Sequence, residues 1–505
     1  MTIMSRFWLF TTLLFLHVQP ACNAQGLNHT FLIGYAASMN KARINFDIDS
    51  VSVVSEVRKM SFRATQANIS DSSGNLLMAS NGCWIANNLG DTMFNGANLN
   101  PNSFTADWCE PSSGLPLPHG NLIVPFPGDS NRYVLFHQTG NYNAGLNSTE
   151  LYFSLIDMTL DSGKGGVYQK NTIILQDTLS WGIAACKHAN GRDWWITVLR
   201  DKSNLIYKIL YTPNGVAIVD TQALGVPFAY GNATQPTFSP DGTKFAYTYG
   251  HSGSVPLHDI RLFQFDRCTG NFYDSTYMAF NDSSTGFGLA FSSNSKYLYF
   301  NTFKRIYQVD TDSSNIAASL QIVAINDTFY SPSPPFQTDF WMMYLAANGR
   351  IYISSGNSVV DLHFINYPDS GGLACDVHQH DLPLPCFSAR GNVNHPNYYL
   401  GPVIGSVCDS LVHVGINEDK RHDFHFSISP NPVTDGYMKI IYMLPKNKSG
   451  VFAVFDINGL IIFKMHLPPW STLQEIKIPN VGAGIYNASI TSGEQRVNMK
   501  IALFE

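Results

Sequence analysis

The chain has 505 residues, of which 45% are hydrophobic, so it is long enough to bury a large core and to form more than one domain. Its formal net charge is -6, and only 13% of its residues are charged. This balance argues against nucleic-acid binding, which requires a basic stripe. Aromatic residues make up 13% of the chain, a proportion that suits a strand-rich protein.

Residues 1–24 have the pattern of a signal peptide. Arg6 is the positive residue, Phe7–Leu16 is the apolar centre, and Cys22–Ala24 provides the small residues of a cleavage site. An apolar run of about ten residues is too short for a membrane anchor. Cys22 could belong to a lipoprotein signal, but the residues before it lack the usual apolar and small pattern. The sequence therefore predicts an exported chain with no later membrane span.

A hairpin pattern recurs through residues 25–410. Its clearest copy is Phe238–Tyr249, in which two apolar runs flank a polar turn with Asp241 and Gly242 at the tip. The copies follow one another about every fifty to sixty residues, and their turn tips are Gly74, Ser130, Gly191, Gly242, Asn294 and Gly349. The intervals also hold a further strand run, at Leu151–Asp157, Leu205–Tyr211, Arg261–Asp266, Arg305–Asp310 and Asp361–Asn366.

Two hairpins in each period make about four strands, which is one blade of a β-propeller. The pattern accounts for six blades directly. A seventh could be assembled from Phe31–Tyr35 and the run before Cys408, which would close the ring between the two ends. We therefore predict an all-β fold for residues 25–410, a propeller of six or seven four-stranded blades.

The chain has eight cysteines, and seven remain once Cys22 leaves with the signal peptide. In an exported protein these are expected to form disulfides. We predict that Cys83 pairs with Cys109 beside the first repeat, and that Cys375 pairs with Cys386 in the loop after the last one. Three more cysteines are left over, so at least one thiol is free; they are Cys186, Cys268 and Cys408. The sequence has no Cys-x-x-Cys pair, which argues against a zinc ribbon or a redox motif.

A search for catalytic motifs predicts no catalytic residue, no cofactor and no metal site. His378 and His380 would share one face of an extended segment and could bind a metal, but a polar loop is the favoured interpretation. Asp193 next to Trp194 and Trp195 could form a sugar-stacking site. We favour packing of the two indoles on opposite faces of a strand, since neighbouring side chains point oppositely. No Gly-x-Ser-x-Gly or His-Glu-x-x-His motif is present.

The composition changes after Cys408. Residues 411–425 are charged and polar and are expected to be a linker. Residues 426–505 then alternate short apolar runs with turns, and the pattern predicts a small Ig-like β-sandwich. The runs are Met438–Met443, Gly450–Asp456, Leu460–Lys464, Leu473–Ile478, Gly484–Ile490 and Arg496–Ile501.

Residues 426–505 resemble the C-terminal sorting domain of the type IX (Por) secretion system of the Bacteroidota. The resembling motifs are Ser429–Pro432, Phe455–Gly459, Gly482–Tyr486 and the last strand, and their key positions are Pro430, Asn431, Pro432, Gly459, Gly484 and Tyr486. The resemblance implies export to the periplasm, followed by passage across the outer membrane through the type IX machinery. It also implies a mature protein that is attached to the cell surface or released, because members of the family are commonly cleaved before this domain.

The preceding region is similar to large secreted, propeller-like proteins of the same bacteria. The similar segments are Ile69–Leu77, Lys187–Trp195 and Asn394–Gly401. That family has no agreed catalytic residues, so the resemblance implies a fold and a location but no active site.

The sequence therefore predicts a secreted or surface-displayed propeller that binds a protein or a polysaccharide through loops at one face or in the central channel. The first alternative is a glycan-acting enzyme with carboxylates around the channel. Clustered acidic residues at the channel mouth would favour this enzyme, whereas an aromatic or neutral face would favour binding. The second alternative is a structural component of a surface layer.

Overall fold

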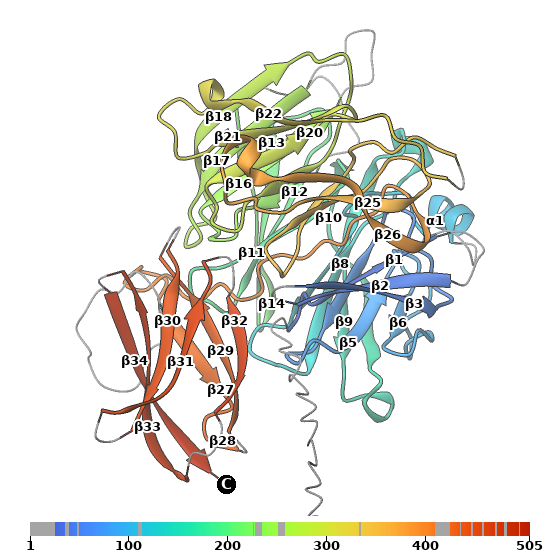
Figure 1. Cartoon of the computed structure of the whole chain (residues 1–505). Coiled ribbons are helices and arrows are strands. Elements are labelled where there is room, and N and C mark those ends of the chain that lie inside the picture. Colours follow the sequence, from blue (N-terminus) through green and yellow to red (C-terminus); the bar gives the residue numbers. More distant parts are fainter. Residues whose placement is uncertain are drawn as a thin grey trace, which may run out of the picture.

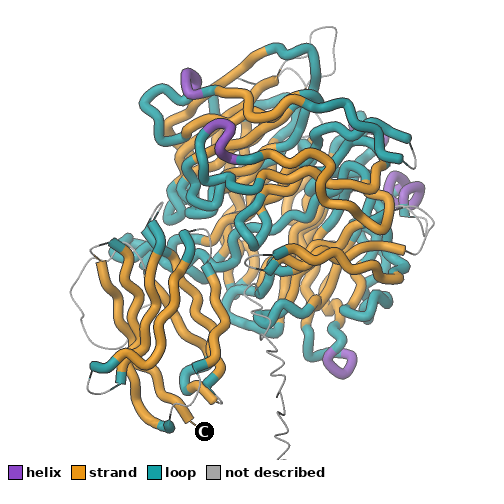
Figure 2. The backbone as a smooth tube through the Cα atoms, viewed as in Figure 1, coloured by secondary structure: helices purple, strands orange, loops and turns teal. Residues whose placement is uncertain are grey.

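The computed structural model describes residues 26–35, 40–47, 50–109, 114–225, 227, 235–250, 258–332, 335–409, 425–434, 436–445, 448–456, 459–469, 472–478, 482–493 and 495–504. The predicted signal peptide (1–24) and all of the predicted linker (411–425) except its last residue lie outside these residues. Strands dominate the fold (Figure 2). No helix in the described part of the chain has the length and apolar character needed to cross a membrane.

Between residues 30 and 388 the described residues form seven antiparallel sheets, each made of strands that follow one another in the chain (Figure 1). Blade 1 is β1–β3 and blade 2 is β4–β6, with bounds Thr30–Ile33, Asn40–Phe46, Val51–Val57, Ala67–Ser70, Leu76–Ser80 and Ile85–Asn87. Blade 3 is β7–β10 and blade 4 is β11–β14, with bounds Asn121–Pro125, Arg132–His137, Ser148–Asp157, Gly166–Leu179, Ala184–Lys187, Trp194–Leu199, Leu205–Thr212 and Gly215–Ala223.

Blades 5, 6 and 7 have four strands each, as blades 3 and 4 do. Blade 5 is β15–β18 and blade 6 is β19–β22, with bounds Thr237–Phe238, Lys244–Gly250, His258–Phe265, Phe272–Phe280, Leu289–Phe291, Tyr297–Asn301, Arg305–Asp310 and Gln321–Ile325. Blade 7 is β23–β26, with bounds Met343–Leu345, Ile351–Ile353, Val359–Ile365 and Val377–Ser388. The helix α1 (Ser103–Trp108) follows blade 2, and single 3-10 turns occur at Tyr142–Ala144, Asp161–Gly163, Ala317–Ser319 and Gly372–Cys375.

The first strand of each blade lies at the inside of a ring. β1, β4 and β7 are successive neighbours, and so are β11, β15, β19 and β23. Blades 1 and 7 close the ring by packing, because Phe31 and Phe46 share one apolar cluster with Tyr344 and Tyr352. The fold is thus an all-β propeller as predicted, and the structure resolves the blade number as seven. Blades 1 and 2 have three strands each among the described residues, rather than the predicted four.

The predicted turn tips all lie between the first and second strands of blades 2–7. Gly242 illustrates why these turns form. Its φ of +71° favours glycine, and a Cβ atom there would lie 2.8 Å from the Cys186 sulfur. The Asp241 carboxylate accepts a hydrogen bond of 3.0 Å from the Thr243 amide and stabilises the turn.

The prediction for the seventh blade was wrong in its composition. Blade 1 consists of β1–β3 alone, so both sides of the ring closure come from complete consecutive sheets. The run before Cys408 contributes no strand to it. Instead, residues 389–409, which we call the axial segment, leave blade 7 and bond to the inner strands of several blades. The prediction was wrong because an apolar run has the same sequence pattern whether it pairs within a sheet or packs inside a channel.

Two disulfides are present in the described part of the chain. Cys83–Cys109 is formed, as predicted, with a Cα–Cα distance of 5.4 Å. The predicted Cys375–Cys386 bond is wrong, because both thiols are free and buried, and Cys268 pairs with Cys408 instead. The residues between Cys375 and Cys386 form the strand β26 rather than a loop, and a strand of that length separates its ends by about 30 Å.

Residues 425–504 form a β-sandwich that is coloured orange to red in Figure 1. One sheet has the order β27-β29-β32 and the other β28-β34-β33-β30-β31. The bounds of β27–β34 in chain order are His425–Ser429, Val433–Thr434, Tyr437–Met443, Gly450–Phe455, Ile461–Leu467, Leu473–Lys477, Gly484–Ser492 and Gln495–Phe504. A core that includes Phe452, Ile490 and Ile501 lies between the sheets.

Candidate functional site

The axial segment fills much of the space inside the ring of blades. The side-chain amide of Asn394 donates to the carbonyl oxygens of Asn121 (3.2 Å) and Ile183 (2.7 Å), next to the inner strands of blades 3 and 4. Asn397 donates to Pro240 of blade 5 over 2.7 Å. Because each bond reaches a different blade, the axial segment links blades 3, 4 and 5 from the inside of the ring.

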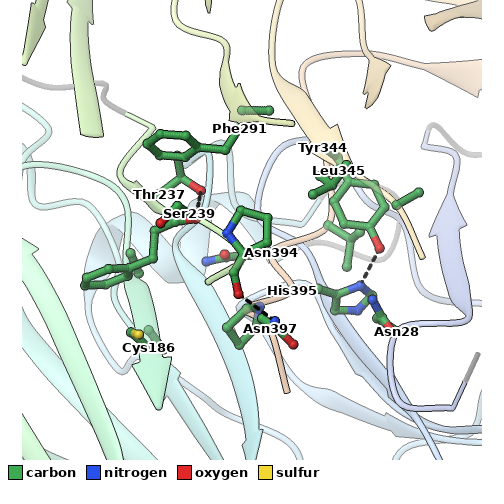
Figure 3. A pocket seen from close by; sticks show the side chains of 18 of the residues that line it. Asn28, Cys186, Thr237, Ser239, Phe291, Tyr344, Leu345, Asn394, His395 and Asn397 are labelled. Carbon is green, nitrogen blue, oxygen red and sulfur yellow. Dashed lines mark hydrogen bonds between the residues drawn. The ribbon is translucent and has the colours of Figure 1, made fainter. Parts of the chain in front are cut away.

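His395 makes the same kind of link between blades 2 and 7. Its Nε2 lies 2.6 Å from the carbonyl oxygen of Asn68, and its Nδ1 lies 2.8 Å from the hydroxyl of Tyr344 (Figure 3). Burial lowers the pKa of His395 to about 4, so the ring is neutral at pH 7. The neutral ring then donates from Nε2 to the carbonyl and accepts from the tyrosine hydroxyl at Nδ1.

The far end of the axial segment is held at blades 4 and 5. The Arg267 guanidinium donates to the carbonyl oxygen of Gly401 over 2.6 Å, and the Val403 amide donates to Ala189 over 2.7 Å. The Cys268–Cys408 disulfide follows. Sequence reasoning missed this role of the segment. The available signal was a cluster of side-chain amides at Asn392, Asn394 and Asn397 in a stretch with no strand alternation.

A cavity of about 150 Å³ remains between the axial segment and the inner strands of blades 4–7. Figure 3 shows it, with Thr237, Phe291 and Leu345 on the blade side and Asn394 on the axial segment. His119 also lines the cavity, and Thr472 and Leu473 of the sandwich contribute at one end. Gln235 supports the wall, because its amide accepts from the Leu289 amide (3.0 Å) and the Met343 amide (3.2 Å).

The walls of the cavity are uncharged. Among the described residues that line it there is no Asp, Glu, Lys or Arg. Burial lowers the pKa of His119 to about 4, as it does for His395, so both imidazoles are neutral. Burial also raises the pKa of the Cys186 thiol to about 12, which keeps it protonated. The cavity therefore presents amides, hydroxyls and apolar surface, without a charged acid–base pair.

The other residues singled out from the sequence lie away from the cavity. His378 contacts the Asp376 and Asp381 carboxylates, whereas Nε2 of His380 lies 2.8 Å from the Asp327 carboxylate, so the two rings bond to different carboxylates. Trp194 and Trp195 are both buried and belong to different apolar clusters, as the alternation of side chains along β12 predicts. Neither indole is available to stack on a sugar.

The predicted sorting-motif residues support the sandwich. The Asn431 amide donates to the Lys500 carbonyl oxygen (3.1 Å) and accepts from the Ala502 amide (3.0 Å), which ties the entry of the domain to its last strand. Pro430 and Pro432 flank it, and both follow cis peptide bonds. Gly459 adopts a φ of +81° after β30, Gly484 begins β33, and the Tyr486 hydroxyl donates to Gly482 over 2.8 Å.

Solved structures with similar architecture have low sequence identity to this chain. A functionally unknown protein from Desulfotomaculum acetoxidans is 12% identical, with 73% of this chain and 99% of that one covered and a TM-score of 0.37. A hypothetical selenium-binding protein from Sulfolobus tokodaii is 10% identical, with 74% and 96% covered and a TM-score of 0.39. A quinonprotein alcohol dehydrogenase-like protein from Bacteroides thetaiotaomicron is 11% identical, with 72% and 75% covered and a TM-score of 0.34. At such scores these similarities carry no argument about activity.

Comparison with curated proteins finds no match. A family match exists at the C-terminal end, where residues 427–503 match the family described as a secretion system C-terminal sorting domain. The match covers the sandwich and its motif residues. The chain thus carries a secretion system C-terminal sorting domain at residues 427–503, and this domain directs its export by the type IX system to the cell surface or the extracellular space.

Proposed function

We propose that this exported propeller is a non-catalytic binding module that takes an uncharged ligand into its channel cavity. The observation that carries the proposal is the uncharged wall of the cavity. Glycan hydrolysis normally requires two carboxyl groups that flank the scissile bond, and no carboxyl group is among the described residues that line this cavity. A rigid ring with a partly polar cavity suits recognition of a ligand.

A ligand screen with two matched variants tests this proposal. The mature chain is screened by calorimetry against neutral and charged sugars, glycans and small metabolites. Ala347 is half-buried and lines the cavity, so Ala347→Trp places an indole where it blocks the cavity. Ala318→Trp is the control, because it places an indole on an exposed turn. We expect saturable binding that Ala347→Trp abolishes and Ala318→Trp leaves unchanged. Turnover of a bound ligand, or binding that is insensitive to Ala347→Trp, would refute the proposal.

Export through the sorting domain gives a second expected result. Deletion of residues 426–505 should leave the propeller in the periplasm, because the type IX machinery no longer has the domain that it handles. Cell fractionation followed by immunoblotting measures the distribution. The matched control is Tyr273→Ala in the full chain, an exposed change on β18, which should reach the surface normally. Surface delivery of the truncated chain would contradict the role of this domain.

A further inference from the structure

The channel cavity reaches the face of the ring that carries the turns between the first and second strands of the blades. Pro240, Ser293 and Ala347 belong to these turns in blades 5, 6 and 7, and all three line the cavity. Thr472 and Leu473 of the sandwich line the same cavity. The sorting domain, which lies beside the propeller in Figure 1, is therefore placed over the entrance of the cavity.

The outer face of the sheet β27-β29-β32 makes this contact. Ile476 of β32 belongs to the sandwich core, so Leu473, three positions earlier, points to the outer face of the sheet. Leu473 pairs with Ile441 of β29, and it is only 4% exposed. An outer leucine of an isolated sandwich would face water, so contact with the propeller accounts for its burial.

Two outward side chains of β29 reach other parts of the ring. Met443 packs against the apolar cluster that blades 4 and 5 share. The Lys439 ammonium donates to the carbonyl oxygen of Ser72 and to the hydroxyl of Ser73 (3.2 Å), in the turn between the first and second strands of blade 2. The sandwich thus contacts the ring on both sides of the cavity entrance.

We infer that the sorting domain is a cover for the channel cavity. The outer face of β29 and β32 docks on the propeller, and a molecule enters the cavity only when the sandwich moves aside. Partly polar contacts between domains of one chain permit such relative motion. The cover itself does not depend on the identity of a ligand. Its effect on binding rests on the proposed function, because a ligand that enters only the open form has an apparent affinity lowered by the fraction of open molecules.

The test measures how fast a small reagent reaches the cavity in the full mature chain. Ala347→Cys places a thiol in the cavity wall, and its reaction with N-ethylmaleimide is followed by mass spectrometry of peptides. The parent chain gives the background from the three free thiols, which are buried. Leu473→Asp brings a carboxylate against the uncharged wall and disfavours the docked form. Leu460→Asp is the matched control, the same change at a sandwich leucine that is 67% exposed.

We expect Leu473→Asp to raise the labelling rate of the introduced thiol at least tenfold and Leu460→Asp to leave it unchanged. Amide hydrogen exchange of β23 and β24 verifies that blade 7 stays folded. If Leu473→Asp loosens blade 7, Lys439→Ala decides instead, with an expected rise of at least threefold from the loss of its bonds to blade 2. A labelling rate that is the same with and without these changes overturns the inference.

Calorimetry separates this inference from the proposed function. For a ligand whose binding Ala347→Trp abolishes, Lys439→Ala should raise the affinity by the same factor as the labelling rate, since Lys439 is not among the residues that line the cavity. Faster labelling without any bound ligand would remove the proposed function and leave the cover standing. Ligand binding with an unchanged labelling rate would do the opposite.

Discussion

Lowering the pH from 7 to 5 is expected to bring the propeller close to unfolding, because four of its histidines are buried in the neutral form. Burial lowers the pKa of His119, His363 and His395 to about 4 and that of His137 to about 3. In the unfolded chain each has a pKa of about 6.5. Between these values the unfolded chain binds more protons than the folded protein, so the stability falls as the pH drops below about 6.5.

The size of this effect follows from the proton linkage. At pH 5 each buried histidine reduces the free energy of unfolding by about 2 kcal/mol, and four together by about 8 kcal/mol. Typical domains are stable by only about 5–15 kcal/mol. Burial raises the pKa of the Asp339 and Asp369 carboxyls, and their protonation in the folded state opposes the loss at lower pH.

Urea unfolding followed by tryptophan fluorescence at pH 7, 6 and 5 measures the loss of stability. His137→Asn should reduce the pH dependence, since it removes the histidine with the lowest pKa, although the bonds of His137 to Asn100 (2.7 Å) and Ser154 (2.9 Å) are also changed. His466→Gln, at an exposed position of the sandwich, is the control and should keep the full dependence. An unfolding midpoint that is constant from pH 7 to 5 would contradict the prediction.

Tyr398→Ala in the axial segment should destabilise the propeller by about 3–5 kcal/mol, the range for removal of a large buried ring. Tyr398 is 4% exposed, its ring contacts Trp194 edge-on at 6.2 Å, and its hydroxyl donates to the Ile123 carbonyl oxygen over 3.0 Å. The loss is large because the ring packs where the axial segment meets the core of blades 3 and 4.

Two further tyrosine variants complete the comparison: one removes only the hydroxyl of Tyr398, and the other is a control at an exposed tyrosine. Tyr398→Phe keeps the ring and loses one hydrogen bond, so it should cost about 1 kcal/mol. Tyr273→Ala, at a residue that is 50% exposed on β18, should change the stability by less than about 0.5 kcal/mol. Urea midpoints at pH 7 measure all three. If Tyr398→Ala costs no more than Tyr273→Ala, the axial segment is not a structural part of the ring.

The local features of this protein followed from the sequence alone. Four of the turns have a glycine with positive φ between two apolar runs, at Gly74, Gly191, Gly242 and Gly349. The shape of such a turn depends on the residues within it, so the local sequence is enough to predict it. The sandwich was predicted for the same reason, since its alternating runs and its motif at Asn431 lie within about 80 residues of chain. Cys83 and Cys109 could be paired because they lie only 26 positions apart, beside the first repeat.

The long-range features were decided only by the tertiary structure. Blade 1 closes against blade 7 through side-chain packing, which leaves no pairing pattern in the sequence. The Cys268–Cys408 disulfide joins residues 140 positions apart, which become neighbours only once the axial segment has crossed the ring. The cavity exists because residues from four blades surround one segment, and no single stretch contains its chemistry. His119 is an ordinary histidine in the sequence, and only burial beside that segment makes it a neutral, unpaired group.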